Sequence, residues 1–331
     1  VNYIGSKLRL SPFIRHTIYS VTGPTKDKVF AELFGGTGIV ARRFKNDVKT
    51  LIVNDIEPYS YTLLRNYIGN TCLFDHHTLI AELNALEGTE GFIFREYCMG
   101  GRAGRQYFSD ENGRKIDAIR MRIEEWRKTN RITLDEYYFL LATLLENADR
   151  VANTAVIYGA FLKHLKKTAQ RTLHLRPAVF SETKTPTHVF CKDANELIGE
   201  ISGDILYLDP PYNARQYGAN YHLLNTIALY DKFIPRGRTG QRAYYRSPYC
   251  RRRKALGAFE DLVKRADFEF IFMSYNNEGI MSARDVCAVM SQFGTYSSVQ
   301  RVYQRFKADK TANRRHKAVS TLEHLHILLK S

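Results

Sequence analysis

The chain of 331 residues is long enough for one large domain, or for a core domain that carries an insertion. It is 44% hydrophobic, which excludes a disordered composition, and no apolar run approaches the ~18 residues of a membrane-spanning helix. Lys and Arg number 49 against 34 Asp and Glu, giving a formal net charge of +15. This excess favours a polyanionic partner, because neutralised phosphates release their counterions.

The sequence pattern of residues 28–67 predicts a βαβ unit. Residues 28–34 read as an apolar strand that runs into Gly35-Gly36-Thr37-Gly38, and residues 39–44 as a helix. Residues 50–54 form a second apolar strand that ends at Asp55, and residues 58–67 a helix. A βαβ unit implies a parallel sheet with helical crossovers, so the pattern predicts a doubly wound, Rossmann-like α/β fold.

The next 120 residues interrupt this rhythm. Residues 97–115 are rich in Gly, Arg and polar side chains and predict a loop. An amphipathic helix is predicted from Leu134, and a further helical stretch over 154–165. We therefore expect a mostly helical insertion at 70–185, with the core formed by 1–69 and 186–331.

Strand patterns return in the last part of the chain. They are predicted at residues 188–191, 204–208, 268–274, 297–306 and 323–329. A basic connection, which includes Lys307, Lys310 and Arg314, joins the last two.

The cysteines and histidines give no sign of a metal centre. The five cysteines are far apart and form no CxxC pair, which argues against both a zinc site and a disulfide framework. His76-His77 and His324/His326 lack convergent partners at ligand spacing. The N-terminus also lacks the apolar core of a secretory signal. We therefore expect no metal and a reducing cytoplasm.

The glycine turn allows three interpretations. Gly36-Thr37-Gly38-Ile39-Val40-Ala41 matches the G-x-G-x-x-A dinucleotide fingerprint and lies between a strand and a helix. A nicotinamide-dependent dehydrogenase would use it for a pyrophosphate. S-adenosylmethionine would use it for close backbone approach, with Asp55 available for ribose hydroxyls. The third interpretation is a tight turn without a ligand, and the turn alone does not decide among them.

The tetrapeptide Asp209-Pro210-Pro211-Tyr212 carries the most specific signal. It directly follows the apolar strand at 204–208, where ligands bind in open α/β sheets. The lone pair of an exocyclic base amine is delocalised into the ring, and two acceptors aimed at its hydrogens would localise it. The Asp209 carboxylate and the Pro210 carbonyl could supply them, and Pro211 stiffens the turn. Tyr212 offers a ring for stacking a base rotated out of the duplex. The alternative is a rigid proline turn that only caps the strand.

A basic, tyrosine-containing run follows this motif. Residues 232–254 hold nine Lys and Arg, and no acid occurs from Lys232 until Glu260. Arginine interleaved with aromatic residues is typical of phosphate and base contact, although a solvated loop would look similar. The candidate DNA contacts are Arg242, Tyr244, Tyr245, Arg246, Arg251 and Arg252, with Tyr249 interleaved.

Together these motifs resemble the N6-adenine-specific DNA methyltransferases of the α group, which includes the Dam enzymes. The resemblance implies S-adenosylmethionine as cofactor and covers nearly the whole chain. Residues 2–7 resemble the N-terminal cofactor motif, and 34–38 the FxGxG loop. It assigns cofactor contacts to Tyr3, Lys7, Phe34, Gly36, Gly38, Asp55, Asp193 and Asp209.

The same resemblance implies the partners and the setting. It adds Arg215, Tyr217, Tyr275 and Asn276 as candidate DNA or base-pocket residues, and gives target recognition to the insertion. The expected substrate is duplex DNA carrying a short specific sequence, in a bacterial restriction–modification system. The expected location is the bacterial cytoplasm, in association with the nucleoid. A cognate endonuclease is expected in the same system without a stable complex.

Two alternatives remain open at this point, one within the methyltransferase enzymes and one from another class. An amino group on RNA adenine, or N4 of cytosine, poses the same chemical problem as N6 of adenine in DNA. A non-catalytic nucleic-acid-binding module could retain the fold. Methyl transfer to each substrate separates these possibilities.

Overall fold

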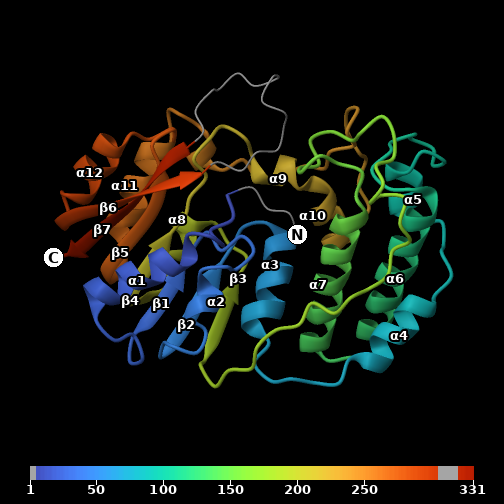
Figure 1. Cartoon of the computed structure of the whole chain (residues 1–331), viewed down its shortest axis with the longest axis horizontal. Coiled ribbons are helices and arrows are strands. Elements are labelled where there is room, and N and C mark those ends of the chain that lie inside the picture. Colours follow the sequence, from blue (N-terminus) through green and yellow to red (C-terminus); the bar gives the residue numbers. More distant parts are fainter. Residues whose placement is uncertain (1–4, 305–319) are drawn as a thin grey trace. The chain divides into compact units, whose positions relative to one another are not determined.

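The computed structural model describes residues 5–304 and 320–331. The chain divides into two compact units (Figure 1). We call the first the sheet unit; it comprises Ser6–Ile56, Lys184–Gln216 and Arg246–Ser331. The second, the helical unit, is formed chiefly by Glu57–Thr183 and Tyr217–Tyr245. The Asp209-Pro210-Pro211-Tyr212 tetrapeptide lies in the sheet unit.

The sheet unit is built on a seven-stranded sheet with the order β3-β2-β1-β4-β5-β7-β6. Its strands are parallel except β7, which runs antiparallel to both β5 and β6. The strands are β1 Val29–Glu32, β2 Thr50–Asn54, β3 Thr187–Phe190, β4 Ser202–Leu208, β5 Asp267–Asn276, β6 Gly294–Gln304 and β7 Ser320–Lys330. The order reverses between β1 and β4, so their carboxyl ends form the crevice in which doubly wound sheets bind ligands.

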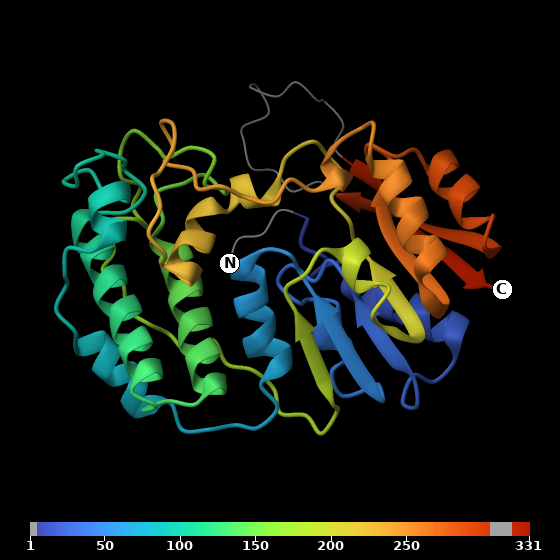
Figure 2. The same ribbon diagram turned by 180° about the vertical axis from the view of Figure 1, so that it is seen from behind.

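Helices cover both faces of this sheet, which explains why its central strands are almost wholly apolar. In Figure 2, α8, α11 and α12 lie over the face turned to the viewer, and in Figure 1 α1 lies over the opposite face. The Phe30 ring of β1 stacks on Phe44 of α2, with centroids 4.3 Å apart. The helices are α1 Ser11–Thr22, α2 Ala41–Phe44, α8 Ala194–Leu197, η2 Pro248–Cys250, α11 Ala255–Arg265 and α12 Ala283–Met290. This is the predicted doubly wound α/β fold.

The helical unit has its own apolar core, formed mainly by α5, α6, α7 and α10. Its long helices α6 and α7 lie side by side (Figure 1). Helix α7 begins with a capping box, in which Thr133 and Glu136 satisfy each other's backbone N–H groups. The elements are α3 Pro58–Leu64, the π-helical turn η1 Arg65–Gly69, α4 His77–Ala85, α5 Phe92–Tyr97, α6 Asp110–Lys128, α7 Leu134–Val151, α9 Tyr217–Asn220 and α10 His222–Leu229.

The helical unit is larger than the insertion expected at 70–185. It also contains Glu57 to Gly69 and Tyr217–Tyr245. The reason is local packing: Asn225 of α10 accepts the Tyr59 N–H at 3.0 Å and donates to the Glu57 carboxylate at 2.6 Å. These bonds attach α3 to α10, so both helices belong to the same compact body.

The predictions for two segments of this unit are wrong. The loop expected over 97–115 ends early, because Ser109 caps α6 by accepting the Asn112 N–H. The helix expected over 154–165 does not form, and the described residues 152–186 contain neither helix nor strand. Amide side chains instead bind the backbone of this segment. The residues that do so are Asn66, Asn84, Asn112, Asn147 and Asn153.

The strand predictions held better than the helix predictions. Strand β2 has the predicted bounds, and the other six strands overlap their predicted ranges. Helix α1 was not predicted from the sequence. The basic connection with Lys307, Lys310 and Arg314 lies outside the described residues, as does Tyr3.

Candidate active site

The Asp209-Pro210-Pro211-Tyr212 turn leaves the carboxyl end of β4, in the center of the parallel sheet. Its backbone is held from the far side of the turn, because the Tyr212 carbonyl accepts the Ile280 N–H at 3.0 Å. Pro210 is buried, whereas Asp209, Pro211 and Tyr212 are partly exposed. The turn is therefore anchored at Tyr212 and by the buried Pro210, while Asp209, Pro211 and Tyr212 each keep part of their surface exposed.

Asp209 belongs to a buried ion cluster. The Lys7 ammonium lies 3.0 Å from Asp209 Oδ1 and 2.8 Å from Glu323 Oε1. Among the residues that the structure describes, only Lys7 pairs with Asp209, and it does so at Oδ1. The second carboxylate oxygen, Oδ2, has no hydrogen-bond or ion-pair partner among those residues.

The charges in this cluster shift one another's protonation. Burial raises the pKa of Asp209 to about 6, and the Lys7 ammonium limits the rise. Burial alone would lower the pKa of Lys7, but the Asp209 and Glu323 carboxylates hold it well above its ordinary value. Lys7 therefore stays charged at neutral pH, and Asp209 is mostly ionised there.

The glycine turn follows β1 and is shaped by positive φ angles at Gly36 (53°) and Gly38 (72°), which favour glycine. The Asp55 carboxylate accepts the Gly36 N–H at 2.7 Å. Asp55 was expected to hold ribose hydroxyls; here one of its oxygens fixes the turn itself. The Gly38 N–H donates to the Gly35 carbonyl at 2.7 Å and closes the turn.

Glu32 is a site residue that the sequence analysis missed. It ends β1, is buried, and accepts the Ala41 N–H at the start of α2 at 2.8 Å. Burial raises the pKa of Glu32 well above its ordinary value, and the Asp209 and Asp55 carboxylates add to the rise. An acid within the apolar strand that leads into the glycine turn was the available signal.

Two other predicted cofactor residues have structural partners. The Phe34 ring lies edge-on to the buried Tyr249 ring, with centroids 5.1 Å apart. Asp193 caps α8 by accepting the Asn195 and Glu196 N–H groups at 2.8 and 3.2 Å. Both residues follow strand ends of the parallel sheet, as predicted, but their side chains also hold local structure.

This crevice suits a cationic ligand with a carboxylate at one end. Glu32, Asp55 and Asp209 place three acids near the carboxyl ends of β1, β2 and β4, with Lys7 as the nearby cation. S-adenosylmethionine carries a sulfonium, an ammonium and a carboxylate, and glycines without a Cβ permit a ligand to approach the backbone of the turn closely. The residues present therefore fit this cofactor.

Residues 3–289 match the D12 class N6 adenine-specific DNA methyltransferase family. The chain belongs to this family. It is 58% identical to Type II methyltransferase M.NlaIII of Neisseria lactamica over 333 residues, which cover 100% of both chains. It is 39% identical to Type II methyltransferase M.CviAII of Paramecium bursaria Chlorella virus 1, with 94% of each chain covered. Type II methyltransferase M.FokI of Planomicrobium okeanokoites is 37% identical, over 93% of this chain and 50% of that protein.

The predicted activity and cofactor are confirmed by this membership. The protein is an adenine-specific DNA methyltransferase that takes its methyl group from S-adenosylmethionine. The dehydrogenase interpretation of the glycine turn is thereby excluded. In the described chain, no helix is long and apolar enough to cross a membrane, and no group of three or more His, Cys, Asp or Glu could hold a metal ion.

The basic residues of 232–254 do not all share one exposed surface. Arg242 forms two 2.9 Å hydrogen bonds with Asp231 and lies over the Phe233 ring, so its guanidinium is already engaged. Tyr249 is buried and donates to Asn195. These contacts argue against DNA contact by Arg242 and Tyr249, because both side chains build the fold.

The second half of the run is more accessible. Arg246 and the cluster Arg251 to Lys254 are exposed, Tyr245 is 39% exposed, and Tyr244 is partly buried. The Gln216 side chain accepts the Ser247 N–H at 2.9 Å and donates to the Ser247 carbonyl at 3.3 Å. This clamp brings the exposed cations of the sheet unit beside the segment that follows the catalytic turn, a proximity that sequence reasoning did not foresee.

The remaining predicted base contacts differ in exposure. Tyr275 is 2% exposed, burial raises its pKa, and its hydroxyl accepts the Met281 N–H at 3.3 Å. This burial argues against a base contact by Tyr275. Asn276 accepts the Glu278 N–H at 3.0 Å in a local turn. Arg215 is exposed, and Tyr217 stacks on Tyr221 in the helical unit.

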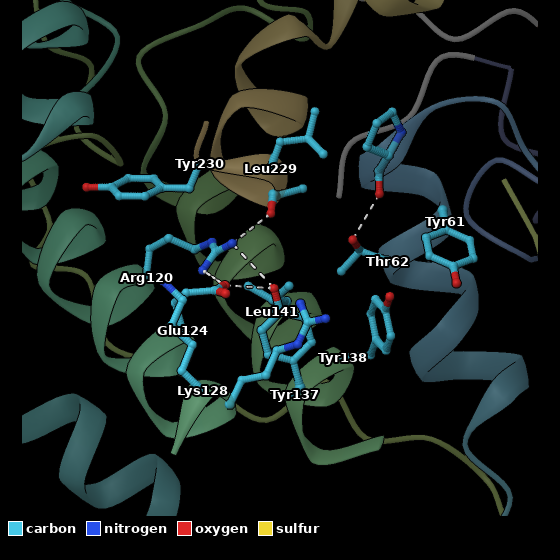
Figure 3. Close-up of a pocket in the computed structure, with 13 residues that line it drawn as sticks. Tyr61, Thr62, Arg120, Glu124, Lys128, Tyr137, Tyr138, Leu141, Leu229 and Tyr230 are labelled. Atoms are coloured by element: carbon cyan, nitrogen blue, oxygen red, sulfur yellow. Dashed lines mark hydrogen bonds and ion pairs between the residues drawn. The ribbon is translucent and has the colours of Figure 1, made fainter. Parts of the chain in front are cut away.

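The helical unit contains a cavity of about 400 Å³ between α3, α6, α7 and the end of α10 (Figure 3). Arg120 points into it but is occupied: it donates to the Ile227 and Ala228 carbonyls and pairs with Glu124 at 3.0 Å. The Tyr137 hydroxyl donates to the same Glu124 carboxylate at 3.1 Å. These polar groups satisfy one another and cap α10, so the cavity has a structural explanation.

Proposed function

We propose that this methyltransferase is the modification enzyme of a restriction–modification system and that Asp209 to Tyr212 position its target adenine. The names of its relatives, which are Type II methyltransferases, support the first part. The observation that carries the second is the place of Asp209 directly after β4, where Lys7 pairs with Oδ1 and Oδ2 has no partner among the described residues.

In the proposed mechanism, Asp209 Oδ2 and the Pro210 carbonyl accept the two N6 hydrogens of the flipped adenine. This arrangement localises the nitrogen lone pair, and Tyr212 stacks on the base. S-adenosylmethionine supplies an electrophilic methyl group on its sulfonium. Formation of the N–C bond would be balanced by cleavage of the S–C bond of this methyl donor, whose electron pair would stay on sulfur. The N6 proton leaves through Asp209, whose pKa of about 6 lets it pass the proton to water.

The cofactor roles follow the arrangement around the crevice. Gly36 and Gly38 give the backbone room to approach the ligand, and Asp55 holds their turn in shape. Lys7 is the cation available to the cofactor carboxylate or to Asp209. Phe34 and Asp193, which follow β1 and β3, are proposed as further cofactor contacts. Tyr3 is assigned as a cofactor contact from the family motif alone.

The order of the motifs supports placement in the α group. The glycine turn comes first, then the helical segment, then the catalytic turn. In this placement the helical unit carries target recognition, and the exposed Arg215, Arg246, Arg251 and Arg252 contact phosphates. Exchange of the whole helical unit with that of a relative should change the methylated sequence, as read by methylation-sensitive sequencing. An unchanged target would place recognition in the sheet unit.

The substrate assignment is tested by labelled methyl transfer. Purified protein is incubated with tritiated S-adenosylmethionine and either duplex DNA or RNA, and the nucleic acid is digested to nucleosides. Label in N6-methyldeoxyadenosine is the expected result. Label in N4-methylcytosine, or only in RNA, would overturn the proposal.

The wider setting is proposed from the same relatives. The protein acts on the chromosome in the bacterial cytoplasm, and a cognate endonuclease shares its target without forming a stable complex. Co-expression with the neighbouring endonuclease followed by size-exclusion chromatography tests this. Separate elution is expected, and co-elution would contradict it.

A further inference from the structure

Glu323 is held rigidly beside the catalytic aspartate by the antiparallel end of the sheet. Strand β7 lies between β5 and β6, and Glu323 is paired in register with Asn276 on one side and Arg301 on the other. Its side chain is 8% exposed and reaches Lys7 across 316 residues of sequence. A backbone paired on both sides leaves little freedom for this carboxylate to move.

A second contact fixes the position of β7 at this point. The Asn277 N–H donates to the Leu322 carbonyl at 3.1 Å, and the Leu322 N–H donates to Asn277 Oδ1 at 3.3 Å. The turn after β5 thus clamps the residue directly before Glu323. This gives the Asn276-Asn277 sequence a role other than base contact.

Lys7 divides its charge between two carboxylates. Glu323 Oε1 is its nearer partner at 2.8 Å, and Asp209 Oδ1 lies at 3.0 Å. With one cation and two anions, the cluster keeps a negative charge, which sits where an adenine amine would be bound. If Glu323 were absent, the ammonium would be free to pair fully with Asp209 and to compete with the amine for its oxygens.

We propose that Glu323 is a positioning residue for methyl transfer: it anchors the Lys7 ammonium at Asp209 Oδ1 and so keeps Asp209 Oδ2 available to the adenine amino group. This rests on the proposed role of Asp209. Glu323 itself touches neither substrate nor cofactor in this scheme. Its effect passes through Lys7.

The electrostatic consequence concerns the groups that face Asp209. These are Lys7 from the N-terminal segment, Tyr207 from β4, Glu32 from β1, Tyr212 from the turn and Glu323 from β7. The Glu323 carboxylate raises the pKa of Asp209, and Lys7 lowers it. Removing the Glu323 charge should therefore lower the pKa of Asp209. The pH below which methyl transfer falls should then be lower as well.

The test compares E323Q with E269Q in the full-length protein. Glu269 is an exposed residue of β5 in the same sheet, so E269Q removes the same charge without touching the cluster. For E323Q we expect a roughly tenfold fall in kcat, S-adenosylmethionine binding by calorimetry within about threefold of wild type, and an acid limb of the kcat profile about one pH unit lower. E269Q should match wild type in all three.

E323D adds a variant that keeps the charge. It should return the acid limb to its wild-type position while recovering only part of kcat, because the shorter side chain holds Lys7 less well. A fall in kcat for E323Q with an unmoved acid limb would show a merely structural role and overturn the inference. So would an E323Q enzyme with wild-type kcat. Absence of methyl transfer in wild type would instead overturn the proposed function, so the two failures are distinguishable.

Discussion

The two units of this methyltransferase use their buried charges differently. In the sheet unit, Lys7 is shared by the Asp209 and Glu323 carboxylates beside the end of β4. In the helical unit, the buried Asp117 and Arg120 bind backbone groups: Asp117 accepts N–H groups of α5, and Arg120 donates to carbonyls at the end of α10. The buried amides of this unit likewise bind the backbone of an irregular segment. Because buried charge is costly unless it is paired or hydrogen-bonded, the helical unit uses its buried polar groups to fix its own backbone, whereas the sheet unit holds a paired ion cluster at its strand ends.

The largest expected effect on activity comes from removing Lys7, the cation of the buried ion cluster in the sheet unit. K7M would leave Asp209 and Glu323 as buried carboxylates without Lys7, so the pKa of Asp209 should rise above 6. We expect methyl transfer at pH 7 to fall about 1,000-fold, with partial recovery toward pH 9. Initial rates across this pH range check it. A rate within threefold of wild type at pH 7 would show that the cluster does not support the reaction.

The matching change in the helical unit removes an amide. Asn112 donates to the Ala169 and Arg171 carbonyls at 3.3 and 2.9 Å and accepts the Leu173 N–H at 2.8 Å. N112A should lower the free energy of unfolding by about 2 kcal/mol, because it leaves buried backbone groups unpaired. Urea denaturation followed by circular dichroism measures this, with the exposed Asn46 changed to Ala as control. Equal midpoints for the two variants would refute a shape-specifying role for the amide.

Proton uptake by Asp209 should distinguish activity from stability. Its pKa is about 6 in the folded protein and ~3.9 in an unfolded chain. Methyl transfer should therefore fall about tenfold per pH unit below 6, since the protonated acid loses its charge. The folded state binds this proton more tightly, so the contribution of Asp209 to stability rises as the pH falls from 6 toward 4. A kcat profile that stays flat down to pH 5 would contradict the first expectation.

The smallest effect concerns the exposed arginines. R251Q/R252Q should reduce the slope of log Kd against log salt by about 2 units, because two phosphate contacts are lost. R242Q serves as the matched control, since Asp231 already holds that guanidinium. Fluorescence anisotropy with a labelled duplex at several salt concentrations measures the slopes. If R242Q changed the slope more than the double variant did, phosphate contact would belong to Arg242 and not to Arg251 and Arg252.

The sequence predicted the parts of this molecule that depend on local pattern. The apolar run of β2 and the Asp209 tetrapeptide at the end of β4 are both read directly from neighbouring residues. Glu323 could not be predicted, because its contact with Lys7 spans 316 residues and its strand shows only an acid within an apolar run.

The helical unit was harder to predict because its amides act at a distance. Helix-like residues at 154–165 form no helix, since Asn153 and Lys166 fix the chain in another path. Tyr275 looked like a pocket residue, but its ring belongs to the core. Single residue types do not reveal which of these roles a side chain takes.

The most direct test of the central claim is single-turnover methyl transfer by D209A. Lys7 retains Glu323 as a partner in this variant, so the fold should persist, and saturating S-adenosylmethionine compensates for the loss of Asp209 as a cofactor contact. We expect the rate of N6-methyladenine formation to fall by at least about 1,000-fold, with a melting temperature close to that of wild type. A D209A enzyme that transferred methyl at the wild-type rate would contradict the account.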